Sequence, residues 1–557
     1  MSKKFKILIV AILVLSLLTT LFAGCSSKNS SQTQQKETQQ AAQNTNSSDP
    51  ENKHFYSEKP LEFTMLYSEH PAYPYKEDWL LWKAIKDMTN VSLKLTVVPM
   101  SDYAQKRSLL ISTGEAPEII PKTYPGQEIP FIPSGAILPV SDYINEMPNF
   151  QKQIKEWNLQ DDINTLKQRD GKFYVLPGLH ELYTPQYTIA IRADIFEKNN
   201  IPIPNSWDEL YAALKKLKEL YPNSYPFSDR WQGKALLNLA LPTFGIPTSS
   251  SDGLINWPTS GVLFDRDNDE FKFYPITEEW KNMLSYFRKL VNEGLLDPES
   301  FTQTDDQAVE KFVTGKSFVI TTNTQEVINM RNRMNETLGK GNYKVTLILP
   351  PAGPAGAVVT GSRLENGIMI SKNALKDPNF HDMLKFIDWL WYSEEGQTLT
   401  KWGVEGVTYK KVDGKFELMP DVTAGFLGLN PNGTKDLRKD FGFGNGVFIL
   451  MYGGPKDLAY SYMTDEAKEF IEGVNKTRKL LPPAPPVLFD ETQREQANMI
   501  NQPLMDYVSQ MTLKFILGQA SLEKDWDNYV QQCRAKGADK LTQLTNEVYK
   551  STKDMLK

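Results

Sequence analysis

Alternating apolar and polar residues near the start of the main body predict strands that are separated by helices. LEFTMLYS at 61–68 places an apolar side chain at every second position, and SLKLTVVP at 92–99 follows the same pattern. Between them 77–89 has helical spacing, a second helical stretch ends near Gly114, and the short apolar segment 118–120 comes next. Strand, helix, strand, helix, strand is typical of a mostly parallel sheet covered by helices, so the expected fold class is α/β.

Later segments continue this alternation and contain two well-marked helices. Ser206 with Glu209 three places on predicts a capping box, and Pro222 ends that helix. Thr277 is the expected cap of the second helix, and Gly294 its expected stop. Four further strands are predicted at YTIAIRADIF (187–196), KSFVITTN (316–323), YKVTLILP (343–350) and NGIMIS (366–371).

Residues 1–24 have the three-part pattern of a secretory signal peptide: a basic start, the apolar run 7–18 and small residues before Cys25. The apolar run is too short to span about 30 Å of hydrocarbon. Cys25 directly after Ala-Gly resembles the lipobox of bacterial lipoproteins, in which the thiol receives a diacylglycerol and the cysteine becomes the mature N-terminus. The usual lipobox has Leu where this chain has Phe22. The alternative is an ordinary signal peptide with an incidental cysteine.

The segment that follows Cys25 is polar and contains few groups that could be buried. Ser, Gln, Asn and Thr dominate 26–54, which predicts a disordered tether reaching roughly 30 Å. We therefore expect a lipidated cysteine and linker over 25–57, with a folded body held just outside a membrane. No later segment has eighteen uninterrupted apolar residues, so none is expected to cross a membrane.

Charge and cysteine content exclude some classes of protein. The formal net charge is −6 and no dense basic cluster occurs, which argues against nucleic-acid binding. Cys533 is the only cysteine besides Cys25, so no internal disulfide is expected. It follows Trp526 and Tyr529 at helical spacing, which predicts a buried, inert thiol.

Two short motifs suggest ligand-binding loops but lack essential residues. TGKS at 314–317 would end a phosphate-binding loop, yet Glu310 stands where that loop needs glycine. DRDNDE from 265 would begin a calcium loop, but Glu270 and Ile276 replace its glycine and its bidentate glutamate. A chance match and a solvated acidic turn are the better interpretations.

Catalytic and metal-binding constellations are not apparent either. None of the four histidines lies within five residues of another, and neither a Gly-x-Ser-x-Gly elbow nor a Cys-x-x-Cys pair occurs. We expect no catalytic residue, no metal and no cofactor. A pair of carboxylates brought together by folding stays possible.

Several longer segments resemble, in order, the signatures of one family. They are STGEAPEII (112–120), GKFYVLP (171–177), IAIRADIFEKNNIPIPNSWDEL (189–210), EKFVTGKSFVI (310–320), LTKWGVEGVTYK (399–410) and the C-terminal stretch 515–550. Behind a lipobox, these segments identify the chain as similar to the family 1 extracellular solute-binding lipoproteins of carbohydrate ABC transporters.

The resemblance implies a two-lobed, periplasmic-binding-protein-like α/β fold with a hinge and a ligand cleft between the lobes. Lobe one is expected at 58–186 and 358–450, and lobe two at 187–357 and 451–557 with the C-terminal helices. Some relatives have a calcium loop after the capped helix. The corresponding YPNSYPFSD, 221–229, lacks the ligands, so calcium is not carried over.

In a sugar-binding site, aromatic rings pack against the C–H faces of the sugar rings, and polar side chains form hydrogen bonds with the sugar hydroxyls. We expect such residues in loops or at strand ends. Trp402, Glu405 and Tyr409 are candidates through the matching element, in which Gly403 and Gly406 allow a tight turn. Candidates elsewhere in loops and at strand ends are Tyr124, Trp231, Trp257 and Asn323. For each aromatic residue, ordinary packing is the alternative. Trp207, Trp280 and Trp391 lie on helical stripes and are assigned to the core.

We therefore expect a monomeric, non-enzymatic binding protein on the extracytoplasmic face of the cell membrane, anchored by lipid. The resemblance implies that it captures an oligosaccharide and delivers it to the permease subunits of an ABC importer. The alternative is a surface glycoside hydrolase or polysaccharide lyase acting on similar sugars. A peptide or cofactor-fragment binder on the same fold is a further alternative.

Overall fold

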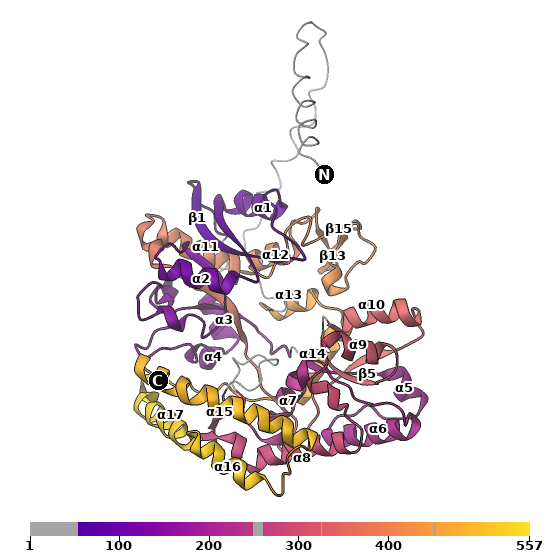
Figure 1. Cartoon of the computed structure of the whole chain (residues 1–557). Coiled ribbons are helices and arrows are strands. Elements are labelled where there is room, and N and C mark those ends of the chain that lie inside the picture. The colour runs from indigo at the N-terminus through magenta and orange to yellow at the C-terminus, as the bar shows by residue number, and fades with distance from the viewer. Residues whose placement is uncertain (1–53, 186, 249–259, 325, 449–452, 557) are drawn as a thin grey trace, which may run out of the picture. The chain divides into compact units, whose positions relative to one another are not determined.

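The computed structural model describes residues 54–556 except 186, 249–259, 325 and 449–452 (Figure 1). The predicted signal peptide, Cys25 and nearly all of the predicted linker lie outside the described residues. Within the described part of the chain, no helix is both long and apolar enough to cross a membrane.

Five strands form the first sheet, in the order β2-β1-β3-β11-β4. Their bounds are β1 Leu61–Glu69, β2 Val91–Pro99, β3 Ile119–Thr123, β4 Leu176–Leu179 and β11 Leu364–Ile370. β1 pairs in parallel with β2 and β3, which confirms the prediction for the first three strands. β11 pairs antiparallel with both β3 and β4, so the complete sheet is mixed.

One face of β1 is buried from Leu61 to Tyr67, as its alternating pattern predicts, and the other face is buried only toward its carboxyl end. Phe63, Met65 and Tyr67 belong to a core cluster shared with α1, α3 and α11, whereas Leu66 belongs to a smaller cluster shared with α2. The helices of this first lobe are α1 Leu80–Thr89, α2 Tyr103–Ser112, α3 Pro148–Glu156, α4 Gln160–Asn164, α11 Phe380–Tyr392 and α12 Glu394–Trp402. Short strands follow at β12 Tyr409–Val412, β13 Lys415–Leu418, β14 Val422–Thr423 and β15 Lys435–Asp436.

Three antiparallel strands, in the order β8-β5-β9, form the second sheet. They are β5 Tyr187–Arg192, β8 Val319–Asn323 and β9 Val345–Ile348. Ile189 and Ile191 face the largest core cluster, and Ala190 between them faces a separate cluster with α9 and α10. The helices here are α5 Ala193–Lys198, α6 Trp207–Leu220, α7 Lys234–Ala240, α8 Glu278–Asn292, α9 Asp305–Val313 and α10 Glu326–Leu338, with a hairpin of β6 Val262–Asp265 and β7 Glu270–Phe273.

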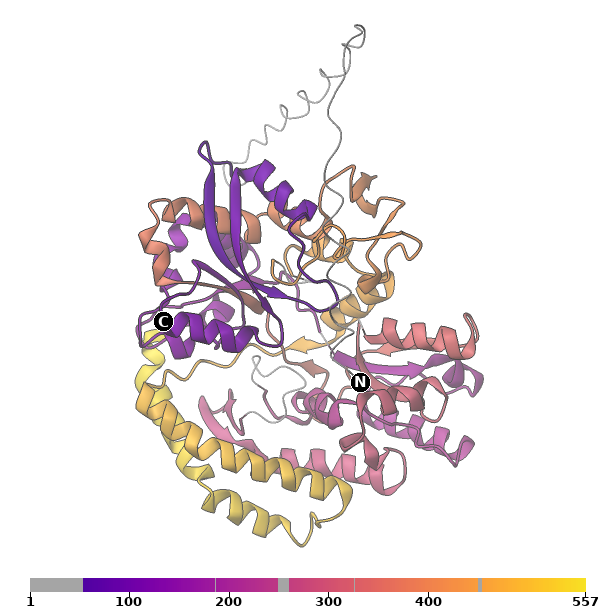
Figure 2. The same ribbon diagram turned by 45° about the horizontal axis from the view of Figure 1, so that its top comes forward.

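The C-terminal helices share the core of the second lobe. They are α15 Glu491–Leu517, α16 Trp526–Ala535 and α17 Ala538–Thr552. Leu504 and Phe515 of α15 join the cluster that contains Trp280 of α8, and Figures 1 and 2 show these helices in yellow beside α8. Cys533 of α16 is fully buried in this cluster, and burial raises the pKa of its thiol to about 12. The prediction of a buried thiol is thus confirmed, and its lack of reactivity stays a prediction.

The segments that connect the two lobes pack on one another. Tyr183, Val359 and Ile471 share a cluster, and the Tyr183 hydroxyl donates to the Thr360 carbonyl at 2.9 Å. The remaining elements lie here: α13 Lys456–Ser461, α14 Asp465–Thr477, and the parallel pair β10 Val358–Val359 and β16 Lys479–Leu480. Each sheet's strands fall within the segments expected for its lobe, while the detailed domain boundaries stay a prediction.

The predicted helix caps are present. The Ser206 hydroxyl accepts the Glu209 N–H at 3.1 Å, although the Glu209 carboxylate accepts from Asn205 N–H rather than closing a box on Ser206. The Thr277 hydroxyl accepts the Trp280 N–H at 3.5 Å. Trp207 and Trp280 are each 2% exposed, which confirms their assignment to the core.

Gly396 of α12 lies against the backbone at the end of α11. A Cβ there would lie 2.2 Å from the Trp389 carbonyl oxygen, so Gly396→Ala is expected to lower the free energy of unfolding by roughly 1–3 kcal/mol. Gly425→Ala in the same lobe is the control, because the nearest atom to its new Cβ lies 4.0 Å away. Urea denaturation of both variants is the measurement, and equal stabilities would contradict the close crossing.

Candidate ligand-binding site

The first lobe contributes polar and aromatic side chains at the carboxyl ends of parallel strands. Lys122 and Tyr124 lie at the end of β3, with the Lys122 Nζ 5.8 Å from the centre of the Tyr124 ring, and Tyr124 is 43% exposed. His70 and Tyr73 follow β1, and their rings stack at 4.3 Å. The pKa of His70 is lowered by burial and then by the positive charges of Arg438 and Lys122, so these groups share one corner.

The second lobe contributes three residues from neighbouring elements. Tyr187, the first residue of β5, pairs with Asn323, the last residue of β8, because the two strands are antiparallel. The Asn323 side chain hydrogen-bonds the Tyr187 hydroxyl. The Trp231 ring meets the Tyr187 ring edge to face, with centroids 5.1 Å apart. Trp231 and Asn323, both predicted from sequence, therefore lie together around Tyr187.

Side chains of the two lobes come within electrostatic range of each other at Tyr124. The pKa of the Tyr124 hydroxyl is raised to about 12, first by burial and then by Glu365 and Tyr187. Tyr187 belongs to the second sheet, so Tyr124 faces the second lobe. We call Lys122, Tyr124, Tyr187, Trp231 and Asn323 the interlobe cluster.

The Trp231 ring is held by charged neighbours. The Arg230 guanidinium lies 4.2 Å from the centre of the Trp231 ring and donates to Glu326 at 2.9 Å. The backbone N–H of Trp231 donates to the Asp305 carboxylate at 2.9 Å. Trp231 and Gln232 have φ of 56° and 57°, in the left-handed region that non-glycine residues rarely adopt. These contacts fix the ring in a backbone conformation that would otherwise be unfavourable.

Asp229 anchors this loop to β8. Its Oδ1 accepts the Thr321 N–H at 2.8 Å and the Thr321 hydroxyl, and its own N–H donates to the Ser300 hydroxyl at 2.8 Å. The Asp229 side chain is fully buried, and no described residue bonds its Oδ2. Burial raises the pKa of this carboxyl group to about 6 despite the two Thr321 donors. Asp229 thus positions both the Trp231 loop and the strand that ends in Asn323.

Trp402 and Tyr409 occupy the core of the first lobe rather than an open site. Trp402 is 1% exposed, stacks on Phe416 at 5.1 Å, and donates its indole N–H to the Ser461 hydroxyl at 2.9 Å. Tyr409 is 6% exposed and also contacts Phe416. Their predicted role as sugar platforms is not supported, because packing covers the rings.

Glu405 lies exposed in the turn between α12 and β12. Gly403 and Gly406 have φ of 89° and 80°, which is the tight glycine turn expected from the sequence. Contact of Glu405 with a ligand stays a prediction. Trp257 falls outside the described residues, as does Cys25.

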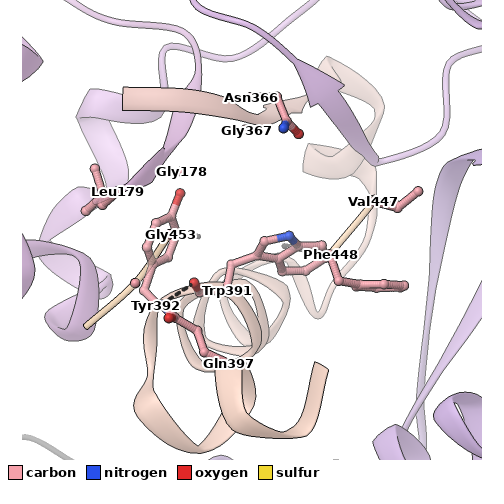
Figure 3. A pocket seen from close by; sticks show the side chains of 11 residues that line it. Gly178, Leu179, Asn366, Gly367, Trp391, Tyr392, Gln397, Val447, Phe448 and Gly453 are labelled. Carbon is pink, nitrogen blue, oxygen red and sulfur yellow. Dashed lines mark hydrogen bonds between the residues drawn. The ribbon is translucent and has the colours of Figure 1, made fainter. Parts of the chain in front are cut away.

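A small cavity lies inside the first lobe (Figure 3) and shares no lining residue with the interlobe cluster. It has a volume of about 20 Å³, enough for a single water molecule and too small for a sugar ring. Trp391 lines it beside Phe448, opposite Asn366. The helical stripe of Trp391 predicts a core residue, but its side chain packs against the core and is only partly buried. The Gln397 amide donates to the Trp391 carbonyl at 2.9 Å, which closes one side.

A larger hollow of about 680 Å³ lies on the second lobe beside Tyr225, within the segment compared above with calcium loops. Two lysine ammonium groups form hydrogen bonds in this region. The Lys311 Nζ donates to Asp297 at 2.7 Å, Glu299 at 2.5 Å and Gln303 at 2.8 Å, and the Lys218 Nζ donates to a loop carbonyl. The described residues contain no group of three His, Cys, Asp or Glu side chains that could hold a metal ion.

Sequence reasoning missed Tyr187, Lys122 and Asp229. Tyr187 opens an alternating strand and Lys122 adjoins a short apolar one, so both resemble ordinary strand residues. An aromatic residue at a strand start faces the end of an antiparallel neighbour, but the sequence does not show which strand is that neighbour.

Two sheets of an α/β fold, with aromatic and polar side chains from both gathered at strand ends, define a two-lobed solute-binding protein. Residues 80–398 match the family model for bacterial extracellular solute-binding protein, and the chain belongs to that family. The family resemblance seen in the sequence is therefore confirmed.

Relatives of similar length support this assignment. The chain is 24% identical over 490 residues to a polygalacturonan/rhamnogalacturonan-binding protein of Bacillus subtilis, covering 85% of this chain and 88% of that protein. It is 25% identical over 481 residues to a fructooligosaccharide ABC transporter substrate-binding protein of Streptococcus pneumoniae, covering 81% and 82%.

Solved structures share the fold. An extracellular solute-binding protein from Bifidobacterium longum subsp. infantis aligns with a TM-score of 0.67 at 18% identity, covering 90% of this chain and 99% of that one. An alginate-binding protein solved without calcium aligns with a TM-score of 0.63 at 20% identity, covering 89% and 99%. The two-lobed fold expected from the sequence is thus confirmed.

The buried Asp229 carboxyl group should make stability depend on pH. Its folded-state pKa of about 6 lies above the ordinary value near 3.9, so between about pH 4 and 6 the unfolded chain releases this proton first. Stability attributable to Asp229 is therefore present at low pH and lost as pH rises through that window.

Asp229→Asn removes the titrating group but keeps an acceptor for the Thr321 N–H. From pH 4 to pH 7 the variant should gain on the order of 2 kcal/mol of unfolding free energy relative to wild type. Urea denaturation of both proteins at several pH values measures this difference. Subtracting the wild-type unfolding free energy from that of the variant cancels the contributions of the other titrating groups. Parallel stability curves for the two proteins would refute the assignment.

Proposed function

We propose that this protein binds an oligosaccharide between its two lobes, outside the cell, and delivers it to the permease of an ABC importer without changing it chemically. The observation that carries this proposal is the interlobe cluster. Aromatic rings of Tyr124, Tyr187 and Trp231 stand beside the Asn323 amide and the Lys122 ammonium at strand ends. Rings suit the C–H faces of sugars, and the polar groups suit their hydroxyls.

The relatives point in the same direction. The Bacillus subtilis relative is named for binding polygalacturonan and rhamnogalacturonan, and the Streptococcus pneumoniae relative for fructooligosaccharides and an ABC transporter. A ligand that contacts both lobes would favour a closed arrangement by its difference in affinity for the closed and open states.

Hydrolysis or elimination is the alternative for a protein that holds sugars. A glycosidase needs one carboxylic acid and one carboxylate facing the scissile bond. Asp305 and Glu326 beside Trp231 are both engaged by the Arg230 guanidinium, at 3.5 and 2.9 Å, which suits positioning better than acid–base chemistry. Incubation of the purified protein with oligogalacturonides and kestose tests this point, since shortened products would indicate an enzyme.

Tyr124 offers a direct test of the proposed site. Loss of its ring face should weaken oligosaccharide binding by roughly 1–2 kcal/mol, or about five- to thirtyfold in dissociation constant. Isothermal titration calorimetry of Tyr124→Ala against kestose and oligogalacturonides is the measurement.

Tyr225→Ala is the matched control, because Tyr225 is 41% exposed against 43% for Tyr124 but lies on the second lobe beside Lys218. Affinity should stay at the wild-type value in the control. Equal effects of the two substitutions, or no effect of Tyr124→Ala on any bound sugar, would remove Tyr124 from the site.

We propose further that Cys25 is lipidated after removal of residues 1–24 and holds the folded body at the outer face of the cell membrane. The Ala-Gly-Cys junction and the polar segment behind it support this proposal. A diacylglycerol carries two acyl chains, and two chains hold a protein stably where one gives only marginal binding.

Cys25→Ala should abolish lipid attachment and leave the fold intact. Detergent-phase partitioning of cell extracts is the measurement: wild type should enter the detergent phase, and the variant should be uncleaved or released. Because a retained signal peptide is itself apolar, mass spectrometry of the mature N-terminus accompanies the partitioning. A wild-type N-terminus without an acyl group would contradict the anchor.

A further inference from the structure

Lys122 lies on a bulge that changes the direction of β3 at the edge of the interlobe cluster. Thr123 pairs with Gly367 and Ile120 with Met369, so Pro121 and Lys122 together face the single residue Ile368 of β11. Lys122 has φ of 54°, a left-handed value that costs a non-glycine residue conformational energy. Bulges of this kind redirect a side chain and are frequent beside functional sites.

Side chains of α2 form hydrogen bonds to the backbone of the bulge. The Tyr103 hydroxyl donates to the Pro121 carbonyl at 2.6 Å, and the buried Arg107 guanidinium donates to the Lys122 carbonyl at 2.8 Å. A second Arg107 nitrogen donates to the Gln127 side chain at 2.9 Å, which tightens the following loop. Both bulged carbonyls are thus satisfied, so the backbone holds Lys122 in a fixed place.

The Lys122 ammonium forms no ion pair with any described residue. No carboxylate of a described residue lies within 4 Å of its Nζ, whereas Arg230 on the opposite lobe is paired with Glu326. Glu365 acts on Lys122 from further away, and its carboxylate contacts the His180 ring at 3.3 Å. Burial lowers the pKa of Lys122, Glu365 opposes this, and Arg438 adds to it.

Arg438 adds a second positive charge at this corner. Its guanidinium lies 5.1 Å from the Tyr73 ring centre and 3.3 Å from that of Phe426, and its Nε donates to the Gly444 carbonyl at 2.7 Å. Gly446 is close by, since a Cβ on it would lie 3.5 Å from the Lys122 Nζ. Arg438 and Lys122 thus lie close enough for each positive charge to act on the other.

We infer that the ligand is an acidic oligosaccharide, and that Lys122 binds a carboxylate on one of its sugar rings while Tyr124 contacts an adjacent ring face. The inference rests on the proposed function and names its substrate class. A partly desolvated ammonium without an anionic partner gains most from a ligand carboxylate, because charge-assisted hydrogen bonds strengthen where water is excluded. A single ligand carboxylate can pair with the Lys122 ammonium, and the neighbouring Glu365 would repel a more highly charged anion.

The test compares an oligogalacturonide with the same chain after methyl esterification, which keeps the sugar rings and removes the charge. The purified full chain should bind the acid form at least tenfold more tightly, and this preference should shrink as salt concentration rises. Lys122→Met should remove most of the preference by weakening binding of the acid form, with the ester form changed by less than about twofold. Lys122→Arg should retain the preference.

Lys94→Met is the control, because Lys94 is an exposed lysine of β2 in the same sheet. It should leave both affinities unchanged, and equal melting temperatures exclude a folding defect in either Met variant. Equal binding of acid and ester by wild type would overturn the inference, as would a Lys122→Met variant that weakens both forms alike. If neither these forms nor kestose binds, the proposed function itself fails and the inference with it.

Discussion

The pairing of β11 with both β3 and β4 is the interaction on which the rest of the described structure depends. β11 follows the second sheet in the chain but completes the first, so the first lobe forms only when distant segments meet. Gly367 makes this possible, since a Cβ there would lie 1.8 Å from the Leu176 carbonyl oxygen. The same register creates the bulge at Lys122 and brings Glu365 to His180. Core and binding site therefore share one strand.

Features that depend on near neighbours could be predicted from the sequence. The Ser206 and Thr277 caps form with residues three places away, and the strands at 61–68 and 92–99 follow from alternation alone. The order of family-like segments then indicated two lobes. Within the site, Tyr124, Trp231 and Asn323 were accessible to this reasoning because each stands in a loop or at a strand end.

Features that depend on distant partners could not be predicted. Trp402 precedes a glycine turn, as a loop aromatic would, but Ser461 and Phe416 draw it into the core. Tyr187 gains its place only because antiparallel pairing sets it opposite Asn323. The bulge at Lys122 arises from a mismatch with β11, which lies more than two hundred residues further along the chain. In each case the position of the side chain is determined by a contact with a residue far away in the sequence.

The left-handed turn at Trp231 has a consequence for how relatives of this protein diverge. Trp231, Gln232 and Gly233 have φ of 56°, 57° and 71°, and only the glycine adopts such values without strain. Asp305 and the buried Asp229 hold the loop backbone, and Arg230 and Tyr187 pack on the indole, before any ligand arrives, so little ordering entropy is lost on binding. Transplanting the tryptophan alone into a related loop would leave it unoriented. Exchange of this loop between homologues therefore has to include Asp229 and Asp305 as well as the tryptophan.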